Sequence, residues 1–404
     1  MHSPDRLHAL DAVRAFALLS GIALHAAQPF LAGMPWMTIE APSTPVATLW
    51  YTIHMFRMPL FFLLAGFFGR MLLERGGTPG FIKDRTRRIL VPLIVGLPVV
   101  MLLTGIGYVL AALATGVDLH SLRGIKPPPS AVNHGPLASI NLIHLWFLYY
   151  LLMFYAGALI VQSVFGNSGR VTTAVDAGVR FLMRGLRGPV LLALPIAVYY
   201  YGSKHWSPWG GLPAPFSLIP DVGALLAYGL FFGFGWLLHR QPQLLQSLEK
   251  RWPLYAALAA AAWAVCRTIG GWTPHWGPFL QGGDLAVYTV SYILTAWCWS
   301  FALIGVAMRF LASYSPVRRY LADSSYWLYL MHIPALLFFA QLLHPLALPG
   351  GVKYLAAIVG TVVILLLSYH YLVRFTFIGA TLNGRKPPRA RILTSSSSIR
   401  ACAG

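Results

Sequence analysis

The stretch LDAVRAFALLSGIALHAAQPF, residues 10–30, decides how this chain folds. It is apolar over most of a length close to the roughly 20 residues that a helix needs to cross a bilayer. Two ionisable residues, Arg14 and His25, interrupt the apolar run. Their separation of eleven residues is three helical turns plus about 20°, or roughly 16 Å along the axis. The two side chains therefore share one face of the predicted helix.

A cleaved signal peptide is the alternative explanation for a basic start followed by an apolar run. The polar residues inside the run argue against it, because an ionisable side chain in a membrane helix is costly and points to a function. We therefore expect an uncleaved first membrane helix.

Composition extends this expectation to the whole chain. Of 404 residues, 57% are hydrophobic and 10% are charged, whereas about 25% are charged in an ordinary soluble domain. The sequence predicts an all-α polytopic membrane protein of about ten transmembrane helices. The predicted spans are 12–33, 46–69, 89–114, 138–163, 188–202, 219–238, 253–269, 283–308, 324–343 and 351–373.

The basic residues predict the orientation of these spans. Ten spans place both termini on one side, and Lys and Arg concentrate in cytoplasmic segments. The segments on the side of the N-terminus, including 70–88, 164–187, 239–252 and 309–323, hold 24 of the 30 Lys and Arg residues. We expect both termini in the cytoplasm, a membrane domain over 1–375 with no soluble domain attached, and a basic, Ser-rich, disordered cytoplasmic tail over 376–404.

The net charge of +19 does not indicate nucleic-acid binding. The basic residues lie in short segments between apolar blocks and form no continuous stripe, which is typical of membrane topology and anionic lipid headgroups. The three cysteines, Cys266, Cys298 and Cys402, have no paired spacing that would predict a disulfide framework or a zinc site. The expected partner surface is the lipid bilayer, and no metal is expected.

The second predicted span contains a buried cation. Arg57 lies near its middle, and His54 stands one turn away on the same face. A guanidinium at that depth needs an anionic partner or a polar cavity. Asp284, near the outer end of the eighth predicted span, is the one embedded acid available, so a bound anionic ligand is the more attractive partner.

A basic motif, KDRTRRILVP, opens the third predicted span. Arg85 and Arg88 are three residues apart, so both can hold one phosphate group. An ordinary cluster of cytoplasmic positive charge is an equally good interpretation.

Two later spans add polar residues. His144 and Trp146 fall in the outer third of the fourth predicted span, and His332 lies deep in the ninth, after Tyr326 and Tyr329. We expect Asp323 at the start of the ninth helix, where a carboxylate suits the helix dipole. The Trp- and His-rich outer loops suit an interfacial aromatic belt or a stacking platform for sugars, and we favour the belt.

At these residues the chain resembles the membrane-bound acyltransferase-3 family, whose members O-acylate glycans of the bacterial cell envelope. The resemblance is carried by Leu10-Asp11, Arg14 and His25, by RMPLFFLLAGFF at 57–68, by Arg85-x-x-Arg88, by HLWFL at 144–148 and by YLMHIP at 329–334. Ala65 departs from the pattern, which more often has Ser there. The motifs HMFRMPLFF and LIHLWFL look most like the branch that succinylates osmoregulated periplasmic glucans.

The resemblance implies a multi-pass protein of the inner membrane that moves an acyl group from cytoplasmic acyl-CoA, either succinyl-CoA or acetyl-CoA, to a periplasmic glucan. It implies catalysis by His25, with Asp11 in its signature, acting as a general base or as a nucleophile. CoA phosphates would bind near Arg14, Arg85 and Arg88. No permanently bound cofactor is implied.

Residue roles beyond the motifs are our inference. Arg57 would pair with the carboxylate of a succinyl group, and the remaining polar residues would bind the acceptor or support the site. These are His54, His144, Trp146, Tyr326, Tyr329 and His332.

Three alternatives stay open. An acetyltransferase acting on an exopolysaccharide or O-antigen would use the same residues. A secondary transporter also places His and Arg in membrane spans, but predicts inverted repeats and broken helices, which this sequence does not show clearly. A non-catalytic scaffold would have no use for His25 or Arg57.

Overall fold

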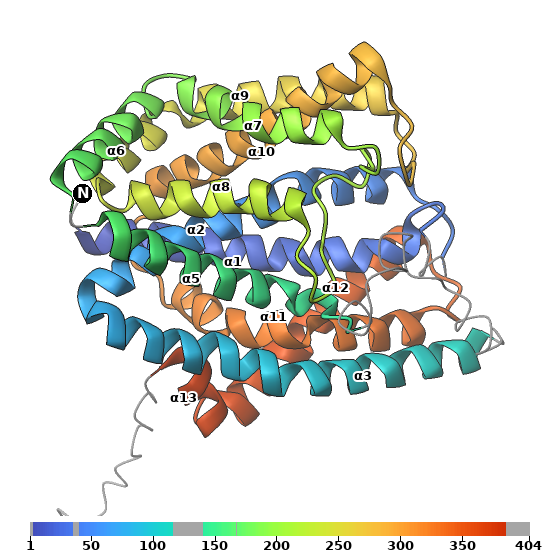
Figure 1. Cartoon of the computed structure of the whole chain (residues 1–404). Helices are drawn as coiled ribbons and strands as arrows, with labels where there is room; N and C mark the ends of the chain where they lie inside the picture. Colours follow the sequence, from blue (N-terminus) through green and yellow to red (C-terminus); the bar gives the residue numbers. More distant parts are fainter. Residues whose placement is uncertain (1–2, 35–39, 116–139, 167, 385–404) are drawn as a thin grey trace, which may run out of the picture.

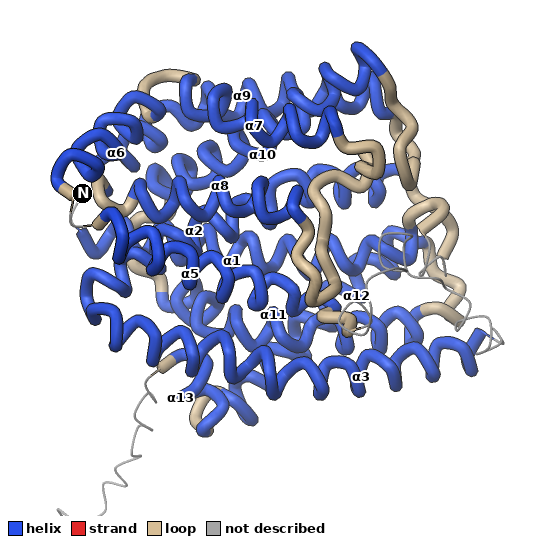
Figure 2. The backbone as a smooth tube through the Cα atoms, viewed as in Figure 1, coloured by secondary structure: helices blue, strands red, loops and turns tan. Residues whose placement is uncertain are grey.

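The fold is a bundle of long helices running side by side (Figure 1). The computed structural model describes residues 3–34, 40–115, 140–166 and 168–384, and these form helices and loops without strands, so the predicted all-α class is confirmed (Figure 2). The helices are α1 (Ser3–Ala27), α2 (Thr44–Arg85), α3 (Val91–Thr115), α5 (Trp146–Phe165), α6 (Gly169–Leu182), α7 (Arg187–Gly202), α8 (Val222–Leu238), α9 (Leu245–Gly270), α10 (Gly282–Phe310), α11 (Pro316–Leu343), α12 (Gly350–Ser368) and α13 (Phe377–Asn383).

A helix occupies each of the ten predicted apolar segments. Within the described residues, seven helical stretches are long and apolar enough to cross a membrane, or eight if α6 and α7, bent by 104°, form one broken span. One stretch, Thr44–Leu110, contains both the second and the third predicted segment, and α8 is shorter, with 17 residues. The number of ten crossings and the cytoplasmic side of the termini stay predictions. The start of α1 and the last helix, α13, lie toward the same side of the bundle (Figure 1).

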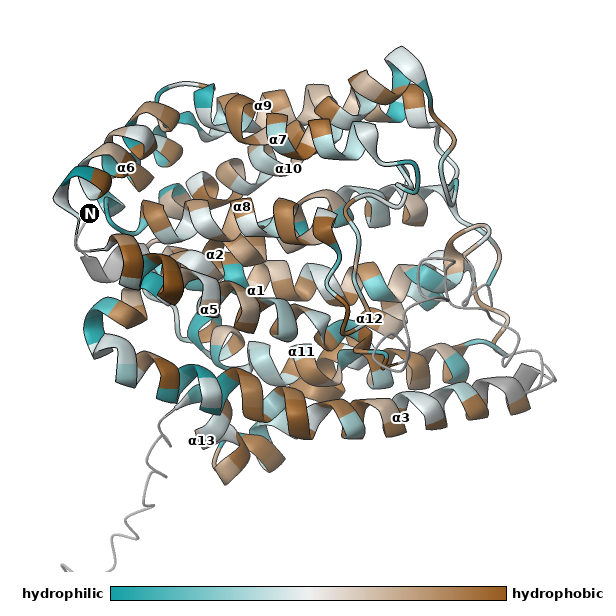
Figure 3. Ribbon diagram, viewed as in Figure 1, coloured by the Kyte–Doolittle hydropathy of each residue, from teal (hydrophilic) through white to brown (hydrophobic). Residues whose placement is uncertain are grey.

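The helix α1 lies at the centre of the bundle, where it packs against α2, α10, α11 and α12. The spans of α1 and α10 are 67% and 72% buried, whereas the other candidate spans are 28–39% buried. The outer helices expose large apolar side chains, such as Leu102 of α3 and Leu355 of α12, which are 65% and 60% exposed. Hydrophobic residues predominate along α3 (Figure 3). An outward apolar surface suits contact with lipid, and it leaves α1 as the interior helix on which a site can be built.

Close packing of α2 against α8 depends on two glycines. A Cβ atom added at Gly66 would collide with the carbonyl oxygen of Phe232, and one at Gly235 would collide with that of Leu63. Small residues let membrane helices approach closely. The glycine in the LAGFF part of the second-span motif therefore has a packing role, which fixes α2 and the residues it carries.

The segment predicted as a loop, 70–88, is largely helical. The helix α2 runs on to Arg85, with a kink at Gly77, whose φ of +62° favours glycine. A π-helical turn, Thr86–Leu90, then leads directly into α3. The basic motif therefore lies on a π-helical turn that continues α2 directly into α3.

One helix start was predicted wrongly. The helix α11 begins at Pro316, with Ser315 as its N-cap, so Asp323 lies two turns inside the helix and not at its dipole-stabilised end. Asp323 instead pairs with Arg319, with a distance of 3.2 Å between Nε and Oδ1. The apolar run had suggested a later start because the first two turns of α11 are polar.

The polar helix α6 is tied to the bundle by an ion pair. Arg240, which follows α8, binds Asp176 with 2.7 Å between Nε and Oδ1, and this hydrogen bond lowers the pKa of Asp176. The predicted tail begins with α13, which packs against the π-helical turn. The rest of the predicted tail, 385–404, Cys402 included, and the predicted outer loop 116–139 lie outside the described residues.

Candidate active site

Three histidines from separate parts of the chain meet around α1. They are His25 of α1, His332 of α11 and His144, which lies in a short 3-10 turn, Ile143–Leu145, before α5. The ring centroids of His25 and His332 are 5.1 Å apart, and those of His144 and His332 are 4.7 Å apart. The structure thus gathers predicted site residues from the first, fourth and ninth spans.

Backbone carbonyls orient two of these rings. The Nδ1 atom of His332 lies 2.7 Å from the carbonyl oxygen of Tyr329, and the Nε2 atom of His144 lies 3.2 Å from that of Leu330. A carbonyl oxygen only accepts, so each of these nitrogens must carry the proton. The other nitrogen of each ring, Nε2 of His332 and Nδ1 of His144, is buried without a hydrogen-bond partner in the described part of the chain.

His25 is in direct contact with Arg57. The NH1 atom of Arg57 lies 3.2 Å from Nε2 of His25. A guanidinium only donates, so Nε2 of His25 must accept this bond and hold a lone pair. The basic nitrogen of His25 therefore faces the guanidinium group of Arg57.

A glycine makes room for this contact. Gly21 lies one turn before His25 on α1, and a Cβ atom there would be 2.9 Å from NH1 of Arg57. No acidic side chain among the described residues forms an ion pair with Arg57. Asp284, the acid considered from the sequence, lies exposed in the first turn of α10. The positive charge of Arg57 is thus available to a ligand.

The basic motif forms a second cluster. Asp84 accepts from Arg85, with 2.9 Å between NH2 and Oδ2, and from Arg88, with 3.1 Å between Nε and Oδ1. The two guanidinium groups therefore converge on a single oxyanion, as expected for a phosphate grip. The role of Asp84 was missed in the sequence, although the acid stands inside the basic motif.

Two tyrosines of α11 connect the clusters. The hydroxyl of Tyr326 donates to the backbone carbonyl of Arg88, and the hydroxyl of Tyr329 donates to that of His144 at 2.8 Å. Successive turns of one helix thereby hold both the basic motif and a site histidine. Tyr326 and Tyr329 act here through backbone contacts with the two clusters.

Asp11 lies with the cations at the opposite end of α1. It pairs with Arg14 at 3.2 Å and with Arg319 at 3.7 Å. Fourteen residues separate it from His25, which is roughly 21 Å along a helix. Any effect of Asp11 on His25 must therefore be transmitted through other groups.

Two candidate residues lie in aromatic packing outside the histidine cluster. The ring of His54 stacks on Trp50 at 4.7 Å, and its Nδ1 atom lies 3.4 Å from the hydroxyl of Tyr292. Trp146 is buried, with its ring 5.5 Å from that of Tyr228. Both positions indicate support of the helix packing rather than contact with His25.

The tryptophans of one outer loop do not fit either predicted role. Trp206 and Trp209 are 6% and 1% exposed, and the ring of Trp209 stacks on that of Trp50 at 5.6 Å. Buried rings can neither line a membrane interface nor stack on a sugar. Trp209 also covers Arg267, a buried arginine whose importance was missed, with 5.5 Å between the guanidinium and the ring of Trp209 and 4.7 Å to the ring of Tyr51.

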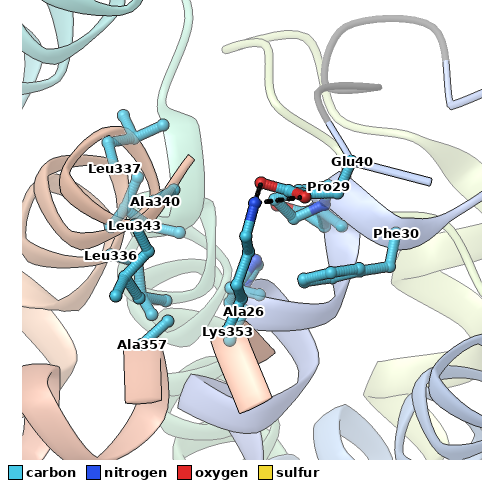
Figure 4. Close-up of a pocket in the computed structure, with 13 residues that line it drawn as sticks. Ala26, Pro29, Phe30, Glu40, Leu336, Leu337, Ala340, Leu343, Lys353 and Ala357 are labelled. Carbon is cyan, nitrogen blue, oxygen red and sulfur yellow. Dashed lines mark hydrogen bonds and ion pairs between the residues drawn. The ribbon is translucent and has the colours of Figure 1, made fainter. Parts of the chain in front are cut away.

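A cavity adjoins the histidine cluster, because His25 is one of its lining residues. Figure 4 shows the side chains around this cavity. His25 and Gln28 line it from the α1 side, and Glu40 and Lys353 bring charge to it. Sequence reasoning missed this ion pair, because Glu40 and Lys353 are 313 residues apart. Among the described residues, no group of three or more His, Cys, Asp or Glu side chains is arranged to hold a metal ion.

Comparisons with known proteins show the family to which the chain belongs. A family model described as an acyltransferase domain matches residues 7–370. Glucans biosynthesis protein C of Escherichia coli K12 is 25% identical over 406 residues, covering 96% of this chain and 98% of that protein. The proteins of that name from strains SMS-3-5 and O157:H7 are also 25% identical, over 410 residues. No solved structure matches.

Proposed function

This chain belongs to the acyltransferase-3 family, and from that premise we propose that it moves an acyl group from cytoplasmic acyl-CoA to hydroxyl groups of a periplasmic glucan. It is a multi-pass membrane protein and an acyltransferase. The observation that carries the finer proposal is the contact between His25 and Arg57 on the central helix, inside a cluster of three histidines. Membership of the family argues against the transporter and scaffold alternatives.

The donor would bind at the basic turn. Arg85 and Arg88 already converge on the carboxylate of Asp84, and a CoA phosphate offers the same kind of oxyanion with more charge. The acyl arm would then follow the shared face of α1 from Arg14 toward His25. This route places the thioester between the two clusters that Tyr326 and Tyr329 connect.

The chemistry needs a base beside the acceptor hydroxyl. In both paths Arg57 would release Nε2 of His25 and donate to the thioester carbonyl oxygen, where it can stabilise the oxyanion that forms there. In one path, Nε2 takes the hydroxyl proton, the sugar oxygen attacks the thioester carbonyl, the C–S bond breaks and the CoA thiolate takes up the proton from His25. In the other path, Nε2 attacks the thioester carbonyl and the C–S bond breaks to release the CoA thiolate. The sugar oxygen then attacks the acyl-imidazole, the C–N bond to His25 breaks and the hydroxyl proton passes to the CoA thiolate.

We favour succinyl-CoA as the donor. The full-length relatives are glucans biosynthesis proteins, and the branch that the sequence resembles succinylates glucans. Arg57 also offers a buried cation without an acidic partner in the described structure, which suits a donor with a free carboxylate. An acetyl donor with an exopolysaccharide or O-antigen acceptor is the alternative.

Reconstitution of the purified protein in liposomes tests the proposal. We expect release of CoA from succinyl-CoA that depends on added glucan, and succinyl esters on the recovered glucan by mass spectrometry. Acetyl esters on another glycan would replace the donor and acceptor proposed here. CoA release from neither donor with any glycan would contradict transfer from acyl-CoA.

The donor site gives a first mutational prediction. We expect Arg85→Ala and Arg88→Ala each to weaken acyl-CoA binding about tenfold, and the double substitution to weaken it further, because each removes a charge-assisted hydrogen bond of about 1.5–3 kcal/mol. Calorimetry with CoA measures the affinity.

Arg87→Ala is the matched control, since Arg87 lies exposed in the same turn. Its loss should leave the affinity within about twofold. Unchanged affinity in the double variant would reduce the motif to a determinant of topology.

A further inference from the structure

We propose that the cavity beside His25 is the acceptor subsite, in which the largely buried Glu40–Lys353 ion pair binds an uncharged sugar residue. This inference rests on the proposed function and adds to it the place and chemistry of acceptor recognition. The cavity is lined both by the catalytic candidate, His25, and by the charged side chains of Glu40 and Lys353.

The walls of the cavity come from four parts of the chain. The first is the end of α1 with the 3-10 turn that follows it, Gln28–Phe30, the second is Glu40 in the segment before α2, and the others are α11 and α12. Lys353, in the first turn of α12, extends between the α11 side chains and Phe30 toward Glu40 (Figure 4). Both charged residues lie on the predicted periplasmic side, from which a glucan would arrive.

The ion pair is tightly built. The Nζ atom of Lys353 is 3.1 Å and 3.0 Å from the two carboxylate oxygens of Glu40, and it donates to the carbonyl of His344 at 2.8 Å. The Nδ1 atom of His344 lies 3.0 Å from Oε1 of Glu40, and it must donate because a carboxylate only accepts. Lys353 is 8% exposed.

The net charge of this pair favours a neutral ligand. Two buried charges cost desolvation free energy, and an apolar pair of similar size is often at least as stable. An ion pair that lies at a cavity despite this cost therefore suits a polar ligand. Glu40 already neutralises the positive charge of Lys353, so the pair offers little attraction to an anion. Sugar hydroxyls, in contrast, can donate to Glu40 and accept from Lys353.

The rest of the lining is mostly apolar. The C–H faces of a sugar ring can pack against these walls, which are formed by Phe30, Ile333, Leu336, Leu337, Ala340, Leu343 and Ala357. A sugar seated there would displace water near His25 and so limit hydrolysis of the thioester. The ion pair would orient the sugar so that one hydroxyl reaches His25.

The test separates acceptor binding from donor binding. We expect Glu40→Gln and Lys353→Met each to raise KM for the glucan at least about tenfold, because each loses a hydrogen bond to a charged group. KM for acyl-CoA, and CoA release without glucan, should stay within about twofold. Asp176→Asn, which breaks the Arg240 pair on α6, is the matched control and should leave both KM values unchanged.

A steric variant covers the case in which a broken ion pair unfolds the protein. Ala340→Phe narrows the cavity and keeps both charges, so transfer to glucan should fall at least about tenfold while CoA affinity persists. Ala156→Phe, at an exposed position of α5, is its control.

Two results would overturn the inference. One is an unchanged KM for glucan in the ion-pair variants together with normal transfer by Ala340→Phe. The other is an equal rise of both KM values, which would indicate a purely structural pair. Failure of the proposed function itself is distinct, because the wild-type protein would then show no glucan-dependent CoA release.

Discussion

Replacing His25 with alanine should abolish glucan-dependent CoA release while leaving expression and thermal stability close to those of the wild type. A positioned base or nucleophile contributes at least about 10²-fold to the rate. Among the residues that the structure describes, the imidazole is the titratable group that both touches Arg57 and lines the cavity. The described structure gives its Nδ1 atom no hydrogen-bond partner, so the substitution removes the hydrogen bond from Arg57 to Nε2 and leaves the apolar residues of α1 in place.

His8→Ala is the matched control for this prediction. His8 lies on the same helix, and its ring contacts Tyr314 at 5.5 Å, away from the histidine cluster. We expect its loss to leave transfer within about twofold of wild type. Retention of more than about a tenth of wild-type activity by His25→Ala would contradict either catalytic role.

Replacing Arg57 with glutamine should lower kcat/KM for succinyl transfer about 10²-fold or more. A planar guanidinium can hold the distal carboxylate of a succinyl group with two parallel bonds, and glutamine cannot. If this is the role of Arg57, acetyl transfer should fall much less. Measurement of kcat/KM with both acyl-CoA donors, for wild type and variant, gives the comparison.

The contact between Arg57 and His25 supports a competing role. At 3.2 Å from Nε2, the guanidinium can brace the imidazole or stabilise an oxyanion, and both donors would then lose activity equally. Gly21→Ala is a second variant that keeps the charge but displaces NH1, since the added Cβ atom would lie 2.9 Å away. Gly157→Ala, whose added Cβ atom meets nothing within 4 Å, is its control.

The pattern in which the two transfer activities are lost identifies the role of Arg57. A loss confined to succinyl transfer in Arg57→Gln supports the carboxylate clamp. Equal losses for both donors, shared by Gly21→Ala, would exclude the clamp and leave succinylation supported by resemblance alone.

Much of the fold could be read from local patterns. Apolar runs long enough to cross a bilayer predicted a helix at each of ten segments, because helix formation and membrane length are properties of consecutive residues. Helical periodicity likewise placed Asp11 beside Arg14, and Arg85 near Arg88, before any contact was known. The same reasoning erred at Asp323, where a polar start to α11 hid the true helix boundary.

The sequence by itself thus determined the helices, the face shared by Arg14 and His25, and the basic turn. Tertiary structure alone decided that His144 and His332 meet His25, that Arg57 reaches it past Gly21, and that Glu40 pairs with Lys353. The physical reason is the distance along the chain over which each effect acts. A period of 3.6 residues fixes which side chains share a helix face, whereas close packing between helices, as at Gly66 and Gly235, fixes which faces meet.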